Sequence, residues 1–383
     1  MKRMAVGVGL VVAGVAAIWV MACSSTTKPN NDGGGGGGVA CDTTTGNYPE
    51  SKCDPGLCDT ELKNCSSQQC KSGAGACSVD TAKCGSTDTC LPMADNSGKT
   101  KLDFRMRRLN IVAPAQLGGA IQSIVINPGI YLNAPTCGEN GKGTFSWLLR
   151  VDKSANTLTT GGAPITGAFD SYCFLKGKFG SIDVQPVTVK VTFAGDTFTS
   201  DKLPNLAVPI FVDANNPVPI ILPLHDTIIK AATVSDSGNC IGHYQKDSLD
   251  NSCLEVDKST CSRWVTGGSL GGYITLEEAD AVDIKDTQRS LCVQLTGDGN
   301  GTVSPEGIKH CSRTNGKLNV IGQGDFCSTT LQPGGCKDSF WLSGTFAASA
   351  AKIDDAPTRA ECTGGSPPQD GGADSGPADA GGD

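Results

Sequence analysis

One glycine-rich motif places a serine where an enzyme could use it as a nucleophile. Residues 267–271 read Gly-Gly-Ser-Leu-Gly and put Ser269 at the centre of a G-x-S-x-G spacing. In hydrolases this spacing forms a strained turn between a strand and a helix, which exposes the serine hydroxyl. A catalytic triad also needs a histidine base and an acidic orienting residue, and the only histidines are His225, His243 and His310. We therefore predict a glycine-rich turn between strands, with a secreted hydrolase using Ser269 as an alternative.

Two further groups have spacing that is typical of metal ligands, but neither is complete. Residues 298–301 resemble part of a calcium loop, in which oxygen ligands alternate along the chain. If Gly301 takes the turn position, the last ligand position falls on Gly307 instead of a bidentate glutamate. Cys240 and His243 are also suitably spaced, but an oxidised cysteine is not a metal ligand. We predict a hairpin turn at residues 298–301 and an ordinary loop around Cys240 and His243. We expect neither a bound metal nor a cofactor.

Aromatic residues raise a second alternative, a carbohydrate-binding module. Trp147, Trp264 and Trp341 could stack on sugar rings if they were exposed on one face. Buried tryptophans are common in the cores of β domains, so we expect these three to pack internally.

Charged residues gather in two short stretches. The basic stretch includes Lys99, Lys101, Arg105, Arg107 and Arg108. It alternates with apolar residues, a pattern that an edge strand carrying charges explains as well as a site for an anionic ligand would. The acidic residues of 277–283 indicate one solvated face.

Cysteine is the most informative reactive residue, with 19 copies in 383 residues. Beyond Cys23, eight cysteines lie between Cys41 and Cys90, and ten lie between Cys137 and Cys362. Both counts are even, so we predict that each segment closes its own disulfides in an oxidising compartment. The paired C-x-x-C knuckles of structural zinc sites are absent. The predicted disulfide cysteines are Cys41, Cys53, Cys58, Cys65, Cys70, Cys77, Cys84, Cys90, Cys137, Cys173, Cys240, Cys253, Cys261, Cys292, Cys311, Cys327, Cys336 and Cys362.

The amino terminus explains why so many cysteines can be oxidised. Two basic residues precede an uncharged, mostly apolar run over residues 4–22, which stops at Cys23. This pattern is typical of an export signal. Residues 20–23, Val-Met-Ala-Cys, resemble the lipobox of bacterial lipoproteins. The resemblance implies cleavage of a signal peptide over 1–22 and lipidation of Cys23, and Ser24 in the next position favours the outer membrane.

An uncleaved anchor is the alternative at the amino terminus, because 19 uncharged residues are just long enough to span a bilayer. Under both interpretations, the residues after Cys23 are exported. The whole-chain pattern is also similar to that of uncharacterised cysteine-rich surface lipoproteins, and that similarity supplies no site.

Composition divides the rest of the chain into four parts. Residues 23–40 include six consecutive glycines and predict a lipid-anchored flexible tether. Residues 41–92 are rich in cysteine and poor in large apolar residues, which predicts a small disulfide-rich module. Residues 101–352 alternate β-branched runs with turn residues and predict an all-β, two-sheet sandwich-like domain. Residues 363–383 predict a disordered acidic tail.

Within the β domain, apolar runs and turn signals predict individual elements. Thr275 and Glu278 have the spacing of a capping box, which would begin one short helix. Residues 273–276 could equally begin a strand, because periodicity over so few residues does not separate the two. The prolines between 204 and 223 cannot donate to a central ladder, so that stretch is predicted to form an edge hairpin or a wrapping segment. The predicted strands are 121–126, 144–151, 187–193, 208–212, 218–222, 227–232, 291–295 and 340–346.

The overall charge excludes some classes of function. The chain has 31 basic and 39 acidic residues and a net charge of -8, which argues against nucleic-acid binding. We expect an exported, lipid-anchored surface protein with a binding or structural role. Its membrane contact would be the lipid anchor, and its extracellular ligand or surface partner is not specified by the sequence.

Overall fold

A computed structural model describes residues 90–119, 121–134, 139–215, 218–244, 264–328 and 337–364. The predictions of a signal peptide, lipidation at Cys23, a tether, most of the disulfide-rich module and nearly all of the acidic tail lie outside these residues. The predicted disulfide cysteines outside them are Cys41, Cys53, Cys58, Cys65, Cys70, Cys77, Cys84, Cys137, Cys253, Cys261 and Cys336. Within the described part, no helix is long and apolar enough to cross a bilayer.

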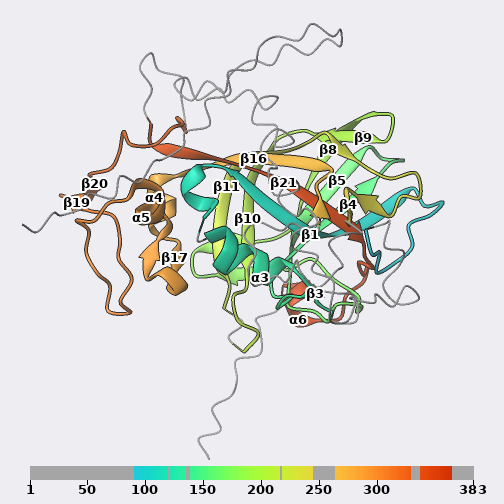
Figure 1. The fold of residues 1–383 in the computed structure, drawn as a ribbon, viewed down its shortest axis with the longest axis horizontal. Helices are drawn as coiled ribbons and strands as arrows, with labels where there is room; N and C mark the ends of the chain where they lie inside the picture. Colours follow the sequence, from blue (N-terminus) through green and yellow to red (C-terminus); the bar gives the residue numbers. More distant parts are fainter. Residues whose placement is uncertain are drawn as a thin grey trace, which may run out of the picture. The chain divides into compact units, whose positions relative to one another are not determined.

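The fold is all-β, as predicted, and is built on one large antiparallel sheet. In spatial order its strands are β10 (Leu203–Ile210), β11 (Ile220–Lys230), β16 (Gly268–Thr275), β21 (Ser339–Ala350), β1 (Lys101–Ala113), β4 (Ser146–Asp152), β5 (Thr157–Ala163), β8 (Val187–Ala194), β9 (Thr197–Ser200) and β12 (Ala232–Thr233). A further short strand, β13 (Cys240–Ile241), pairs with β21. Figure 1 shows β16, β21 and β1 side by side across the middle of the domain.

The sheet curls so that its two ends face each other across the core. Strands β10 and β11, at one end of the order, contact β5, β8 and β9 near the other end. The layers approach closely where Gly162 on β5 meets Pro209 on β10, since a Cβ atom at Gly162 would clash with the proline ring. This curling gives the sandwich-like arrangement with a single main core.

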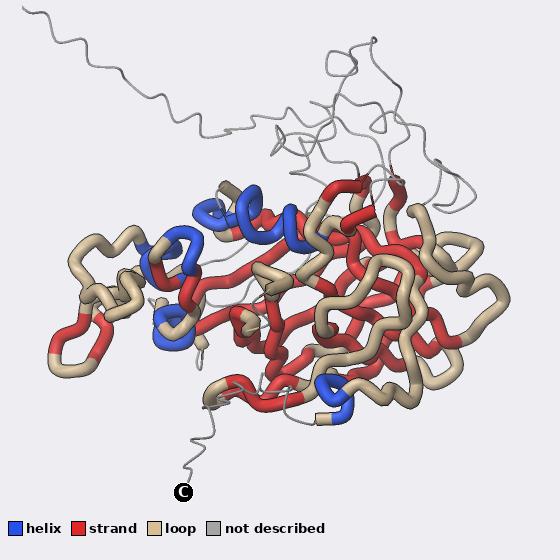
Figure 2. The backbone as a smooth tube through the Cα atoms, turned by 90° about the horizontal axis from the view of Figure 1, so that it is seen from below, coloured by secondary structure: helices blue, strands red, loops and turns tan. Residues whose placement is uncertain are grey.

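The central strands are buried on both faces. Every residue of β21 is buried, and most residues of β1 are buried as well. Short helical segments contact β1, namely η2 (Ala115–Leu117), η3 (Ile121–Ile126) and α3 (Asn127–Ile130). Figure 2 shows that the helical segments are short and lie outside the strands.

The remaining elements are small hairpins and single turns. They are β2 (Asn133–Ala134) with β3 (Glu139–Asn140), β6 (Gly177–Phe179) with β7 (Ile182–Val184), β14 (His243–Tyr244) with β15 (Trp264–Val265), β17 (Asp283–Ile284) with β18 (Arg289–Ser290), β19 (Arg313–Thr314) with β20 (Lys317–Leu318), and the helical turns α4 (Leu276–Asp280), η7 (Lys285–Thr287), α5 (Leu291–Thr296) and α6 (Ala360–Thr363).

Two predicted strands are wrong, because both runs are helical. Residues 121–126 form η3, and residues 291–295 lie within α5. The hydroxyl of Ser290 accepts a hydrogen bond from the amide of Val293, and Gly297 ends α5 with a φ of 72°. These caps decide in favour of a helix, since a short apolar run has no periodicity that separates a strand from a buried helix.

The predicted capping box is confirmed. Thr275 is the N-cap of α4, its side chain accepts from the amide of Glu278, and the Glu278 side chain accepts in return from the Thr275 amide. The predicted edge hairpin is also confirmed, because β10 is an edge strand paired with β11. Pro204 and Pro209 lie on this edge strand, where a missing N–H is tolerated.

The edge-strand prediction for the basic stretch is wrong. Strand β1 lies in the middle of the sheet, between β21 and β4. Arg105, Arg107 and Arg108 are all fully buried there. Arg105 donates to the Ser146 hydroxyl and to several main-chain carbonyls. Arg107 lies over the ring of Trp264, with its guanidinium carbon 4.9 Å from the ring centroid.

Three disulfides join described residues, and one of them corrects the predicted pairing. The bonds are Cys90–Cys240, Cys173–Cys362 and Cys292–Cys311, with Cα–Cα distances of 5.5, 5.9 and 6.0 Å. Cys327 is also disulfide-bonded. Because Cys90 belongs to the first cysteine segment and Cys240 to the second, the segments do not each close their own bonds. Each segment holds an even number of cysteines, but the cysteines do not pair only within their own segment.

Candidate ligand-binding groove

A groove of about 720 Å³ lies where three parts of the fold meet. One wall is the β6–β7 hairpin. The second is formed by residues 212–213 after β10 and by residues 218–221 around the start of β11, and the third runs from the end of α4 to η7. This volume is within the range of small-ligand sites, about 300–1,000 Å³. The described lining residues are Lys178, Phe179, Gly180, Ser181, Ile182, Val212, Asp213, Val218, Pro219, Ile220, Ile221, Ala281, Val282, Asp283, Lys285 and Asp286.

The first two walls share a small core of their own. Leu175, Val184 and Phe211 form a buried cluster, and Phe179 and Ile221 pack against it. Near the same hairpin, the amide of residue 176 donates to the carbonyl of residue 361, and α6 contacts β6. The Cys173–Cys362 disulfide joins these two stretches covalently. The hairpin wall is therefore held in place by packing, hydrogen bonding and a cross-link.

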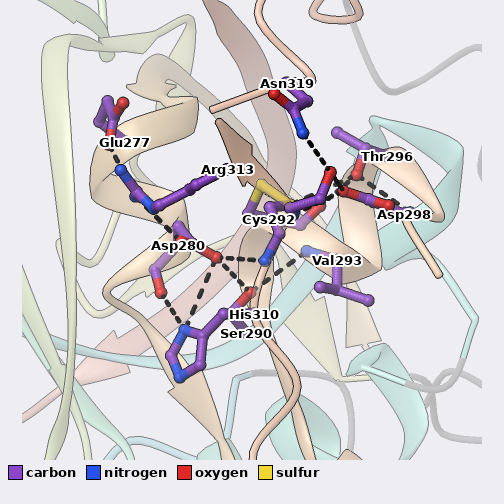
Figure 3. The surroundings of a disulfide bond; sticks show 12 residues. Glu277, Asp280, Ser290, Cys292, Val293, Thr296, Asp298, His310, Arg313 and Asn319 are labelled. Carbon is purple, nitrogen blue, oxygen red and sulfur yellow. Dashed lines mark hydrogen bonds and ion pairs between the residues drawn. A yellow bond between two sulfur atoms is a disulfide. The ribbon is translucent and has the colours of Figure 1, made fainter. Parts of the chain in front are cut away.

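The third wall is positioned by the buried carboxylate of Asp280, shown in Figure 3. Asp280 is only 5% exposed. Its Oδ1 accepts from the Ser290 hydroxyl at 3.0 Å and from the Cys311 amide at 2.7 Å, and its Oδ2 accepts from Arg313 at 3.0 Å. The Cys292–Cys311 disulfide lies beside it. These hydrogen bonds connect the end of α4 to the N-cap of α5 and to the segment after α5. They therefore hold the chain in place where it leaves α4 for β17.

The acidic stretch is therefore not one solvated face, as the sequence indicated. Asp280 is buried in the network above, whereas Glu277 is half exposed and pairs with Arg313 at 2.7 Å. Glu278 pairs with His225 on a neighbouring strand. The residues differ because successive positions on α4 point in different directions.

Asp283 has the most unusual surroundings of the groove's charged residues. Its Oδ1 has no exposed surface and no hydrogen-bond donor among the described residues, although the side chain as a whole is 44% exposed. The nearest described group that can carry a positive charge is the imidazole of His310, whose Nε2 lies 3.7 Å from that oxygen. Burial raises the pKa of Asp283, and the charges of Asp280 and Glu306 add to this effect. The charges of His310 and Lys285 work against it.

One group of metal-type ligands occurs in the described residues. Atoms of Asp280, Cys292 and Cys311 lie within 4.8 Å of one another, and all three residues are buried. The two sulfur atoms are joined in a disulfide, and a disulfide offers no thiolate to a metal. In this oxidation state the group therefore stabilises the third wall.

The G-x-S-x-G motif does not form a nucleophile elbow. Ser269 lies in β16, opposite Lys230 of β11 on one side and Thr345 of β21 on the other. Its hydroxyl donates to the Lys230 carbonyl at 3.0 Å. The strand continues to Thr275, so the strained strand-to-helix turn of a hydrolase is not present at the serine. The predicted turn at this position is likewise wrong.

The three tryptophans considered for sugar binding are buried. Trp147, Trp264 and Trp341 are 3%, 0% and 4% exposed. The indole Nε1 of Trp147 donates to the Thr160 hydroxyl at 2.6 Å. Core packing is therefore confirmed for all three.

The other groups with metal-like spacing are also explained by local structure. The hairpin turn predicted at residues 298–301 is wrong, because these residues follow the C-cap of α5 and join no paired strands. Asp298 accepts hydrogen bonds from the amide of Asn300 and from the amide and hydroxyl of Ser312. Both carboxylate oxygens of Asp298 are therefore already hydrogen-bonded within the loop. Cys240 is oxidised, as predicted, and His243 is exposed on β14. The groove itself was not predicted, because it forms between segments far apart in the sequence.

Comparison with known proteins gives no match to a family model, to a curated protein or to a solved structure.

Proposed function

We propose that this chain is an exported, lipid-anchored surface protein whose β domain binds a small ligand or a short peptide segment in the groove. The observation that carries the binding role is the groove itself, which has a mostly apolar lining that also includes five charged side chains. Sites of this kind fix a ligand by apolar contact and orient it with a few polar groups.

The export part of the proposal is supported by the disulfides and by the amino-terminal sequence. Bonds such as Cys90–Cys240 and Cys173–Cys362 are typical of proteins from oxidising compartments. Residues 20–23 resemble a lipobox, and acyl chains on Cys23 would hold the protein on a membrane without a spanning helix.

Binding is favoured over the two alternatives by particular contacts. The hydroxyl of Ser269 is engaged with a neighbouring strand, which is a poor starting point for a nucleophile. The buried tryptophans offer no stacking platform for sugars. Neither a hydrolase nor a carbohydrate-binding module has comparable support.

The groove is tested with n-hexanol, a neutral probe with an apolar tail. Ligand-observed NMR should show hexanol binding to the wild type, and Lys178→Trp should weaken binding at least fivefold because the indole fills the groove. Lys190→Trp is the matched control, since Lys190 is an exposed lysine on β8 that does not line the groove. Equal binding by both variants would place the hexanol elsewhere and remove the groove from the proposal.

The anchor is tested separately by cell fractionation. Cys23→Ser should release the protein from the membrane fraction, whereas continued retention would favour an uncleaved helix.

A further inference from the structure

We propose that the ligand of the groove carries an ammonium or guanidinium group next to an apolar portion, with the cation at Asp283 and the apolar portion on the groove floor. This inference rests on the proposed binding role and adds the chemical class of the ligand.

The floor of the groove is suited to an alkyl or aromatic group. Its apolar lining comes from all three walls, including Phe179, Pro219, Ile220 and Val282. Val218 at the margin is 69% exposed and extends this apolar surface outward. An apolar group that covers these side chains removes apolar area from water on both partners.

Asp283 is the carboxylate in the groove that would gain most from a cation. Its Oδ1 is shielded from water without a described donor, so the exposed surface of the side chain belongs to its other atoms. A carboxylate that has lost part of its hydration and is not fully hydrogen-bonded is stabilised by a nearby positive charge. The raised pKa of Asp283, caused mainly by burial, is consistent with this situation.

The other charged side chains that line the groove also favour a cationic ligand. Three carboxylates line the groove, on Asp213, Asp283 and Asp286, against the ammonium groups of Lys178 and Lys285. Both lysines are exposed, and Lys285 is adjacent to Asp286 in the turn η7. An anionic ligand would therefore meet two solvated lysines in a groove that also holds three carboxylates.

The test compares three probes with the same alkyl chain, hexylammonium, hexanol and hexanoate, titrated into the wild-type protein at neutral pH. Hexylammonium should bind at least fivefold more tightly than hexanol, and hexanoate should bind most weakly. In Asp283→Asn, the affinity for hexylammonium should fall to within about twofold of that for hexanol. Asp196→Asn is the matched control, since it removes one negative charge from an exposed residue outside the groove.

The possible outcomes separate this inference from the proposed function. Equal binding of the three probes would overturn the preference for a cation and leave the groove as an apolar site. If hexanoate bound most tightly, the preference for a cation would be overturned, and Lys178 and Lys285 would be the groups that recognise the ligand. Absence of binding by all three probes would remove both the proposed groove function and this inference. The ranking of probes on the wild type decides the matter even if Asp283→Asn does not fold.

Discussion

The Nε2 atom of His225 lies 2.7 Å from Oε1 of Glu278, which joins strand β11 to the first turn of α4. The other ring nitrogen, Nδ1, lies 2.8 Å from Oδ1 of Asn205 on β10. The ring also packs against Tyr273, with 5.2 Å between ring centroids. Because acceptors face both nitrogens, this arrangement favours the doubly protonated imidazolium.

The pair is expected to make stability depend on pH. The hydrogen bond to Glu278 raises the pKa of His225, although burial opposes this. Burial opposes the shift at Glu278 too, but hydrogen bonds from His225 and Thr275 outweigh it and lower the pKa of Glu278. The stabilisation from His225 is complete below its ordinary pKa of 6.5 and is lost as the pH rises through its folded-state pKa. That from Glu278 is present above 4.5 and is lost as the pH falls through its folded-state pKa.

The first prediction is that Glu278→Gln lowers the melting temperature most between pH 4.5 and 6.5. Glutamine keeps the capping box, so the change removes mainly the ion pair. Both side chains are partly exposed, so the effect should be only about 1 kcal/mol. Thermal unfolding followed by circular dichroism at several pH values measures it. Asp196→Asn serves as a control, and a Glu278→Gln effect as large at pH 9 as at pH 5.5 would contradict the assignment.

The second prediction concerns the long-range disulfides. Cys90→Ala with Cys240→Ala should destabilise the protein more than Cys292→Ala with Cys311→Ala. The separations are 150 and 19 residues, and loop-closure entropy then gives losses of about 5 and about 3 kcal/mol. Urea unfolding of the two double variants tests this order. The reverse order would mean that packing around Cys292 outweighs the effect on the unfolded chain.

The third prediction concerns the pairing of the remaining cysteines. With Cys90 joined to Cys240, seven cysteines remain between Cys41 and Cys84. An odd number cannot pair completely within its own segment, so at least one of them should bond to a cysteine beyond Cys90 if the mature chain holds no free thiol. Peptide mapping by mass spectrometry without reduction will identify the bond. A free thiol in that segment, or a bond to a second molecule, would refute the prediction.

The fourth prediction concerns the buried guanidinium of Arg105. It donates to the Ser146 hydroxyl and to the carbonyls of Met106, Ile130 and Phe145. Arg105→Ala leaves these buried acceptors without their donor and opens a cavity, so the free energy of unfolding should fall by about 3 kcal/mol or more. Chemical denaturation measures the loss. Lys178→Ala, a change of an exposed residue, should shift stability by less than about 0.5 kcal/mol.

Local sequence signals predicted the parts of the fold that depend on near neighbours. The capping box of Thr275 and Glu278 works within one helical turn. Strand β8 follows a β-branched run, and strands β4 and β21 follow runs that contain aromatic and other apolar residues. The run at 291–295 was misread as a strand because its apolar residues fit either structure, and the caps at Ser290 and Gly297 lie outside the run itself.

Features that depend on distant segments could not be predicted from the sequence. Arg105 is charged and was expected at an edge, but its acceptors come from residues 25 to 41 positions away and from its neighbour Met106. The groove combines segments near residues 180, 220 and 283, which no spacing rule connects. Its carboxylate Asp283 was noticed only as one member of an acidic stretch, since burial of one oxygen cannot be inferred from composition.

The two long-range disulfides overlap along the chain, since Cys173 lies inside the loop closed by Cys90–Cys240 and Cys362 lies beyond it. A protease that cuts one peptide bond anywhere between Cys90 and Cys362 therefore leaves both fragments covalently joined. Such a nicked molecule would run as one species on a gel without reductant and separate only after reduction. The β domain therefore stays attached to the residues that precede Cys90, even after a single cleavage between Cys90 and Cys362.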